Sequence, residues 1–321
     1  MSQKEVMAII AQIHKNVLKK DYICLSPKCT EMSINSHLLQ QNGVLNNLAE
    51  NNHLIEVRPK TIFEIQENSL TKFDRISVSK AVSFPLFCDY HDSKIFKVIE
   101  TYPVDFMKYN NQLLFSYRSL CAELRKKELG IETSKRLLNA NTLENMINSK
   151  YLSNEVEEET IRLNALIKYK EMFESEIGNN SAGNFTFKTL KYEPIKIGVS
   201  ATFSVFVRDG NVDYKDELNH NIFVNIIPQI DSLNIIIGYH NNYCDEWVVN
   251  YVKSWEGLTF TELKVAITDL IANRIETWTI AESLSKSISE DKKQEFLKYT
   301  NDTSNYTYKN SYRISNFNIF D

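Results

Sequence analysis

Four residues near the start of the chain have the types and spacing of a zinc site. Cys24 and Cys29 are separated by four residues, and Cys88 and His91 are separated by two. Zinc takes thiolate and imidazole ligands in a tetrahedron, and one tight loop can supply two of them. We therefore predict that Cys24, Cys29, Cys88 and His91 bind one structural Zn²⁺. The alternative is that the cysteines are small buried apolar residues and His91 is a core histidine.

The cysteine count and the N-terminal segment indicate a reducing compartment. The chain has five cysteines, and its first residues, MSQKEVMAIIAQIHK, lack the apolar stretch of a signal peptide. No run approaches the roughly 18 apolar residues that a membrane-spanning helix needs. In a reducing cytosol, cysteines stay as thiols or bind metals. We therefore expect a cytoplasmic protein that does not associate with membranes.

Charge is unevenly distributed along the chain, whose net charge is −4. Residues 1–127 hold 17 Lys and Arg against 13 Asp and Glu, and the remainder holds 20 against 28. A mild positive bias is compatible with nucleic acid, but it is much weaker than the basic surface of a dedicated binder. We expect a protein partner or self-association first, with nucleic acid as a second candidate.

The elements that must position the four ligands are helices and strands in alternation. Apolar residues at helical spacing predict a helix over residues 2–20, and Ser36 resembles the N-cap of a helix that runs through Leu48. Two extended segments should follow, at His53–Arg58 and Arg75–Phe87. Another helix is expected over residues 105–128, with Cys121 on its buried stripe.

The second half of the chain changes from helical to strand periodicity. Asn154, with Glu157 three residues later, resembles a capping box that opens a helix ending near Gly178. A linker rich in Gly and Asn follows, up to Gly183. Alternating apolar residues then predict four antiparallel strands, with a turn at Arg208–Val212, and three helices after them. The strands are Phe185–Tyr192, Ile195–Val207, Asn221–Ile227 and Leu233–Tyr239, and the helices are Asp245–Trp255, Phe260–Ile275 and Ala281–Thr300.

These elements predict an α+β fold in three parts. Residues 1–128 should form a zinc-braced, treble-clef-like α/β module, because the second ligand pair lies between an expected strand and an expected helix. Residues 129–183 should be a helical connector. Residues 184–321 should form an antiparallel sheet packed against the C-terminal helices.

The first module resembles zinc-braced nucleases of the HNH, or ββα-metal, class. The residues that carry the resemblance are Cys24 and Cys29, the pair Ser36-His37, and Phe87-Cys88 with His91-Asp92, within about residues 20–97. The resemblance implies that His37 is a general base and that Asp92, or Asn35, contacts a catalytic Mg²⁺ or Mn²⁺. The chain departs from the family at Ser36-His37, where the family has two His or an Asp-His. The same outline is similar to uncharacterised bacterial proteins of phage-defence loci.

Three hypotheses for the function follow from these residues. The first is a bacterial accessory or effector protein, for instance of a phage-defence system, with structural zinc and a C-terminal domain that binds a ligand or partner. The second is an HNH-like metal-dependent nuclease that uses His37 and Asp92. The third is another hydrolase whose groups lie near His240, Asp245 and Glu246. P-loop, nucleophile-elbow and dinucleotide-binding signatures are absent from the sequence.

Overall fold

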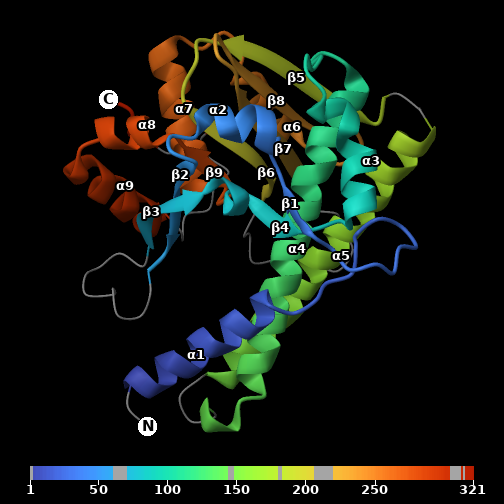
Figure 1. Cartoon of the computed structure of the whole chain (residues 1–321), viewed down its shortest axis with the longest axis vertical. Coiled ribbons are helices and arrows are strands. Elements are labelled where there is room, and N and C mark those ends of the chain that lie inside the picture. The colour runs from blue at the N-terminus through green and yellow to red at the C-terminus, as the bar shows by residue number, and fades with distance from the viewer. Residues whose placement is uncertain are drawn as a thin grey trace.

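Two long helices form a hairpin that lies between a large antiparallel sheet and the helix that begins at Asp89 (Figure 1). The computed structural model describes residues 3–60, 71–143, 148–179, 183–205, 220–303, 312–313 and 315–321. The fold is α+β, as the sequence predicted. Within the described residues, no helix is long and apolar enough to cross a membrane.

The described elements alternate between helices and short strands in the first hundred residues, and separate into long helices and longer strands afterwards. A π-helical turn, Gln41–Leu45, precedes the short second helix. The helices are α1 (Gln3–Leu18), α2 (Asn46–Leu48), α3 (Asp89–Glu100), α4 (Tyr109–Leu138), α5 (Ser149–Asn179), α6 (Glu246–Lys253), α7 (Phe260–Asn273), α8 (Glu282–Ser287) and α9 (Glu290–Thr303). The strands are β1 (Asn35–His37), β2 (His53–Pro59), β3 (Thr71–Ser77), β4 (Ser83–Pro85), β5 (Phe185–Tyr192), β6 (Ile197–Val205), β7 (His220–Pro228), β8 (Leu233–His240) and β9 (Trp278–Ile280).

Seven strands form one sheet in the order β3-β2-β9-β6-β7-β8-β5, and every pairing is antiparallel. Strands β5 to β8 are contiguous within it, which confirms the sheet predicted for residues 184–240. β6 contains the β-branched residues Ile197, Val199, Thr202 and Val205, and such residues lose rotamer freedom in helices, which favours a strand here. A second, two-stranded sheet pairs β1 with β4.

The two faces of the large sheet belong to two different cores. On β7, Ile222, Val224 and Ile226 pack with α6 and α7, whereas Phe223 and Ile227 pack with the α4–α5 hairpin. This assignment follows from the period of two along a strand, which sends alternate side chains to opposite faces. All five side chains are at most 1% exposed. The central strands are therefore apolar on both faces, unlike a sheet with one face in water.

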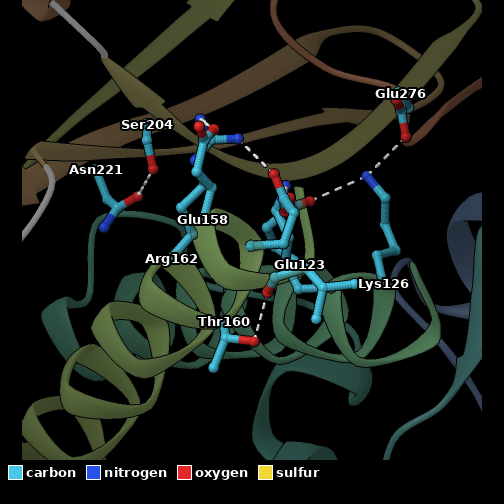
Figure 2. A network of polar contacts seen from close by, with 11 residues as sticks. Glu123, Lys126, Glu158, Thr160, Arg162, Ser204, Asn221 and Glu276 are labelled. Atoms are coloured by element: carbon cyan, nitrogen blue, oxygen red, sulfur yellow. Dashed lines mark hydrogen bonds and ion pairs between the residues drawn. The ribbon is translucent and has the colours of Figure 1, made fainter. Parts of the chain in front are cut away.

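Polar and charged side chains also join the hairpin to the sheet. Figure 2 shows Lys126 of α4, whose ammonium lies 3.0 Å from carboxylate oxygens of both Glu123, on its own helix, and Glu276, just before β9. Ser119 of α4 shares a 3.0 Å hydrogen bond with Thr202 of β6. A mixed interface of this kind fixes the register of the helix on the sheet, because each polar group must meet its own partner.

The segment after the first cysteine pair differs from the prediction. Ser36 is not the N-cap of a helix; it lies in β1, and its hydroxyl accepts a hydrogen bond from the Phe87 backbone N–H at 3.3 Å. A serine ahead of apolar residues resembles a helix N-cap, but here the serine hydroxyl oxygen accepts from the backbone N–H of Phe87 instead of from a helix N–H. The strand predicted for Arg75–Phe87 is likewise divided by a 3₁₀ turn at Val78–Lys80.

Several helix boundaries also differ. Helix α5 begins at Ser149, and Asn148, rather than Asn154, accepts a backbone hydrogen bond from Tyr151 at 3.1 Å. The single helix predicted for Ala281–Thr300 is two helices, α8 and α9, divided at extended Ile288. The predicted turn at Arg208–Val212 and most of the predicted linker lie outside the described residues.

Helix α4 is longer than predicted and continues through residue 128, where the sequence placed the end of the first module. Strands β2 and β3, from that module, join the sheet built by the C-terminal half. The division into 1–128, 129–183 and 184–321 stays a prediction about folding units.

The contact between the hairpin and the sheet gives a direct test of the fold. Phe223 is fully buried and its ring meets the rings of Tyr169, Phe173 and Phe185. We expect Phe223→Ala to lower the free energy of unfolding by about 3–5 kcal/mol in urea denaturation, because a large cavity remains. The matched control is Phe260→Ala, since Phe260 is 38% exposed. A comparable loss in both variants would contradict the described packing.

Candidate metal centre

The first ligand pair sits on a tight turn that the local sequence favours. The Cys29 backbone N–H bonds the Ser26 carbonyl at 3.2 Å, which closes a four-residue turn with Pro27 at its second position. Proline is favoured there because its φ is already fixed near the required value. Lys28 takes a positive φ of 61° at the third position. The turn directs both cysteine side chains to one side, and the Ser26 N–H contacts the Cys24 sulfur at 3.4 Å.

The second ligand pair is positioned by the start of α3. Cys88 is the N-cap residue of this helix, and its carbonyl accepts the Asp92 backbone N–H at 2.9 Å. His91 lies three residues later, and residues three apart lie on the same face of a helix. The spacing of two intervening residues therefore places the His91 ring directly against the Cys88 sulfur.

The two pairs converge as the sequence predicted. The ligand atoms of Cys24, Cys29, Cys88 and His91 all lie within 4.8 Å of one another. The Cys29 and Cys88 sulfurs are 3.9 Å apart, and the His91 Nδ1 lies 3.6 Å from the Cys24 sulfur and 3.2 Å from that of Cys88. A tetrahedral zinc ion would separate two sulfurs by about 3.8 Å, and sulfur from nitrogen by about 3.6 Å. The cluster is therefore consistent with zinc, and Nδ1 is the His91 nitrogen that faces the sulfurs.

The electrostatic surroundings of the thiols differ. Burial raises the pKa of the Cys24 thiol to about 11. A hydrogen bond with the His91 backbone lowers the pKa of the Cys88 thiol. Zinc binds thiolates, so its binding must displace the proton from Cys24 as well as from Cys88. The chemistry of the donor set therefore suits Zn²⁺ better than Mg²⁺ or Ca²⁺, which prefer oxygen ligands.

The loop that carries Cys24 is anchored to the rest of the fold by backbone contacts and one buried arginine. The Leu25 N–H bonds the Leu86 carbonyl at 2.9 Å, just ahead of the second ligand pair. Arg125 of α4 is 3% exposed and donates to the Ile23 carbonyl at 2.7 Å, with its guanidinium 4.8 Å from the Tyr22 ring centroid. The sequence had not singled out this arginine.

A second buried arginine accounts for Asp92, the residue that the resemblance placed in a catalytic site. Arg118 is 1% exposed, and its Nη2 lies 3.4 Å from Asp92 and 2.7 Å from Glu100, both on α3. Its guanidinium also stacks 4.0 Å from the centroid of Phe96. The Asp92 carboxylate therefore helps to dock α3 on α4. Within the described residues, no metal cluster other than the Cys₃His group is present.

His37 lies outside the Cys₃His cluster. It is the last residue of β1, is half-buried, and its Nε2 lies 3.0 Å from the Val78 carbonyl. Asn35, on the same strand, donates to the Ser83 hydroxyl at 2.7 Å. Nearby, the half-buried Glu56 accepts the backbone N–H of Val82, whose φ of 37° is unusual for a β-branched residue. The structure thus places His37 beside a constrained turn and places Asp92 with Arg118.

The candidate residues of the C-terminal half, His240, Asp245 and Glu246, make separate interactions. His240 is 4% exposed, burial lowers its pKa, and its Nδ1 accepts the Asn242 N–H at 3.2 Å. Asp245 is the N-cap of α6 and its second oxygen lies 3.4 Å from His220, a residue that the sequence had not singled out. Glu246 is exposed on the first turn of α6. Nothing in this arrangement favours a hydrolase over capping and core roles.

Comparison of the chain with known protein families, with curated proteins and with solved structures finds no match. The functional argument therefore depends on the geometry of the Cys₃His cluster and on its surroundings.

Loss of one ligand should release the metal. We expect the wild-type protein to bind one zinc per chain, and Cys29→Ser to bind none and to unfold at a lower temperature, because a structural zinc can contribute on the order of 10 kcal/mol to folding. The control is Cys244→Ser, since Cys244 lies outside the cluster. Metal analysis by mass spectrometry and thermal unfolding give the two readouts. Full zinc content in Cys29→Ser would remove Cys29 from the ligand set.

The Arg118 contact predicts a second stability effect that is separate from zinc. Arg118→Met leaves Asp92 and Glu100 without their cation, and we expect a loss of about 2–3 kcal/mol in the free energy of unfolding. Arg136→Met is the control, since Arg136 pairs with Glu132 but is 36% exposed and should cost under about 1 kcal/mol. Denaturation of both zinc-loaded variants measures the difference. Equal costs would show that the Arg118 contacts do not hold α3.

Proposed function

We propose that this chain is a binding protein whose single zinc ion is structural. The observation that carries the proposal is the convergence of four possible ligands, Cys24, Cys29, Cys88 and His91, which together would fill all four tetrahedral positions of one zinc ion. Catalytic zinc sites keep one position for water or substrate, whereas structural sites take four protein ligands. The zinc would hold the loop before β1 against the start of α3, and it would have no catalytic role.

The cellular setting that we propose is that of a bacterial accessory or effector protein, for instance in a phage-defence system. The resemblance of residues 20–97 to proteins of such loci supports this setting. The C-terminal half supplies a broad scaffold, since its sheet is covered on both faces, and we propose that this half binds a ligand or a protein partner. The test is phage plaque formation on a bacterial host that expresses this gene with its native neighbours. Unchanged plaque numbers with and without the gene would reject the setting.

An HNH-like nuclease is the second candidate, and one observation favours it. Strands β1 and β4 pair antiparallel and α3 follows β4 directly, which is the ββα order of that class. His37 ends β1 outside the zinc ligands, and the Val78 carbonyl orients its imidazole. The engagement of Asp92 by Arg118 speaks against this candidate, because it removes one expected ligand of the catalytic cation.

A plasmid-nicking assay separates the two candidates. For a structural-zinc binding protein, we expect no nicking by the zinc-loaded chain with Mg²⁺ or Mn²⁺, because nothing would activate water or neutralise the developing phosphate charge. The matched variants are His37→Ala and His53→Ala. Cation-dependent nicking that is lost in His37→Ala and kept in His53→Ala would establish the nuclease and end the first proposal.

A further inference from the structure

A cavity of about 400 Å³ that is open to solvent adjoins His91, one of the four proposed zinc ligands. Its walls come from the first cysteine loop, from α3, from the first turns of α4 and from the end of α5. Its volume lies in the range of small-molecule sites. The polar groups on its wall are Ser26, His91, Lys94 and Asn110.

The imidazole of His91 presents a free donor on this side. Its Nδ1 faces the Cys24 and Cys88 sulfurs, so with zinc bound there its Nε2 carries the ring proton. Zinc-bound histidines almost always donate this second N–H to a carboxylate, a carbonyl or water. Within the described part of the chain, no protein group accepts it. The cavity that His91 lines is where an acceptor would lie.

A second, independent observation points the same way. Ser26 is 8% exposed, and its hydroxyl has no hydrogen-bond partner among the described residues although it lines the cavity. The Asn110 side chain is also on the wall. A hydroxyl, an imidazole N–H and a side-chain amide are all hydrogen-bond donors. The polar lining of the cavity is therefore suited to an oxygen-rich group.

The charge of the wall selects an anion. Lys94 is the one charged residue on the described lining, and its ammonium lies 2.9 Å from the Tyr90 hydroxyl. With zinc bound, three thiolates and one Zn²⁺ would give the metal cluster a formal charge of −1, and Lys94 supplies the one positive charge of the described lining to a ligand. The imidazole, and not the sulfurs, faces the cavity, so a ligand anion would meet donors first.

The other side chains that line the cavity are apolar. They are Ile95 and Val98 of α3, of which Val98 is 42% exposed, Leu114 of α4 and Ile177 of α5. Burial of hydrocarbon against such a wall contributes roughly 25 cal/mol per Å². An occupant must therefore combine one anionic oxygen group with an apolar body.

We propose that this cavity binds a small apolar carboxylic acid, with its carboxylate at Lys94 and the His91 Nε2–H and its hydrocarbon against Ile95, Leu114 and Ile177. The carboxylate would complete the hydrogen bonding of the zinc-bound imidazole. All walls are helices or a turn, so no strand edge is present to pair with a peptide backbone, and a free acid fits better than a peptide terminus. The assignment rests on the proposed zinc at Nδ1 of His91.

The test uses full-length zinc-loaded protein with octanoate as the probe and octanamide as its uncharged counterpart. Titration calorimetry should give a low-millimolar or tighter Kd for octanoate, and octanamide should bind at least about tenfold more weakly, because it lacks the charge-assisted hydrogen bonds. Lys94→Gln should weaken octanoate binding by a similar factor. The control is Lys97→Gln, an exposed lysine of the same helix that does not line the cavity, and it should leave binding unchanged.

Further arms separate failure of the cavity from failure of the zinc site. Zinc content is measured for each variant, and Val98→Trp should fill the space and abolish octanoate binding while one zinc is retained. No octanoate binding by zinc-loaded wild type, or equal affinities for octanoate and octanamide, would overturn the cavity assignment and leave the zinc site intact. Tighter binding of N-acetyl-Gly-Gly-Leu than of octanoate would overturn the choice of a free acid.

Discussion

A four-way contact between two cysteines of an early loop and a cysteine and histidine at the start of α3 brings together distant segments of the first third of this chain. The Cys29 and Cys88 sulfurs are 59 positions apart in sequence and 3.9 Å apart in space. One ion at this point would close a long loop, and closing such a loop removes conformational freedom mainly from the unfolded chain. Strands β2 and β3, which lie between the two ligand pairs in sequence, can then join the seven-stranded sheet while the two pairs stay together.

The long helix α4 transmits this local constraint to the rest of the molecule. Arg125 contacts the loop beside the first ligand pair, and Arg118 contacts α3 just after the second. Farther along the same helix, Lys126 reaches Glu276 beside β9. One rigid element therefore touches both ligand segments and the sheet. A ligand bound in the cavity beside His91 would also contact Leu114 of α4, the helix that packs against the sheet.

The ligands were predictable and their surroundings were not, for a physical reason. The spacing of Cys24 to Cys29 and of Cys88 to His91 reflects local turn and helix geometry, which a sequence displays directly. The strands of residues 184–240 were equally readable, since their short runs of β-branched and aromatic residues are a local signal. By contrast, Ser36 was misassigned because its hydroxyl is used by Phe87, a residue far along the chain. The three-residue β9 is too short to show a period, and its pairing with β2 and β6 depends on the tertiary fold. The roles of Arg118 and Asp92 likewise depend on a long-range pairing that no local pattern encodes.

The central claim is that Cys24, Cys29, Cys88 and His91 together hold one zinc ion with no open position. X-ray absorption at the zinc edge of the purified protein measures the ligand set directly. The account predicts three sulfurs at about 2.3 Å and one nitrogen at about 2.0–2.1 Å. A shell with an oxygen ligand in place of a sulfur, or a fifth ligand from water, would contradict a closed structural site and would reopen the question of catalysis at this metal.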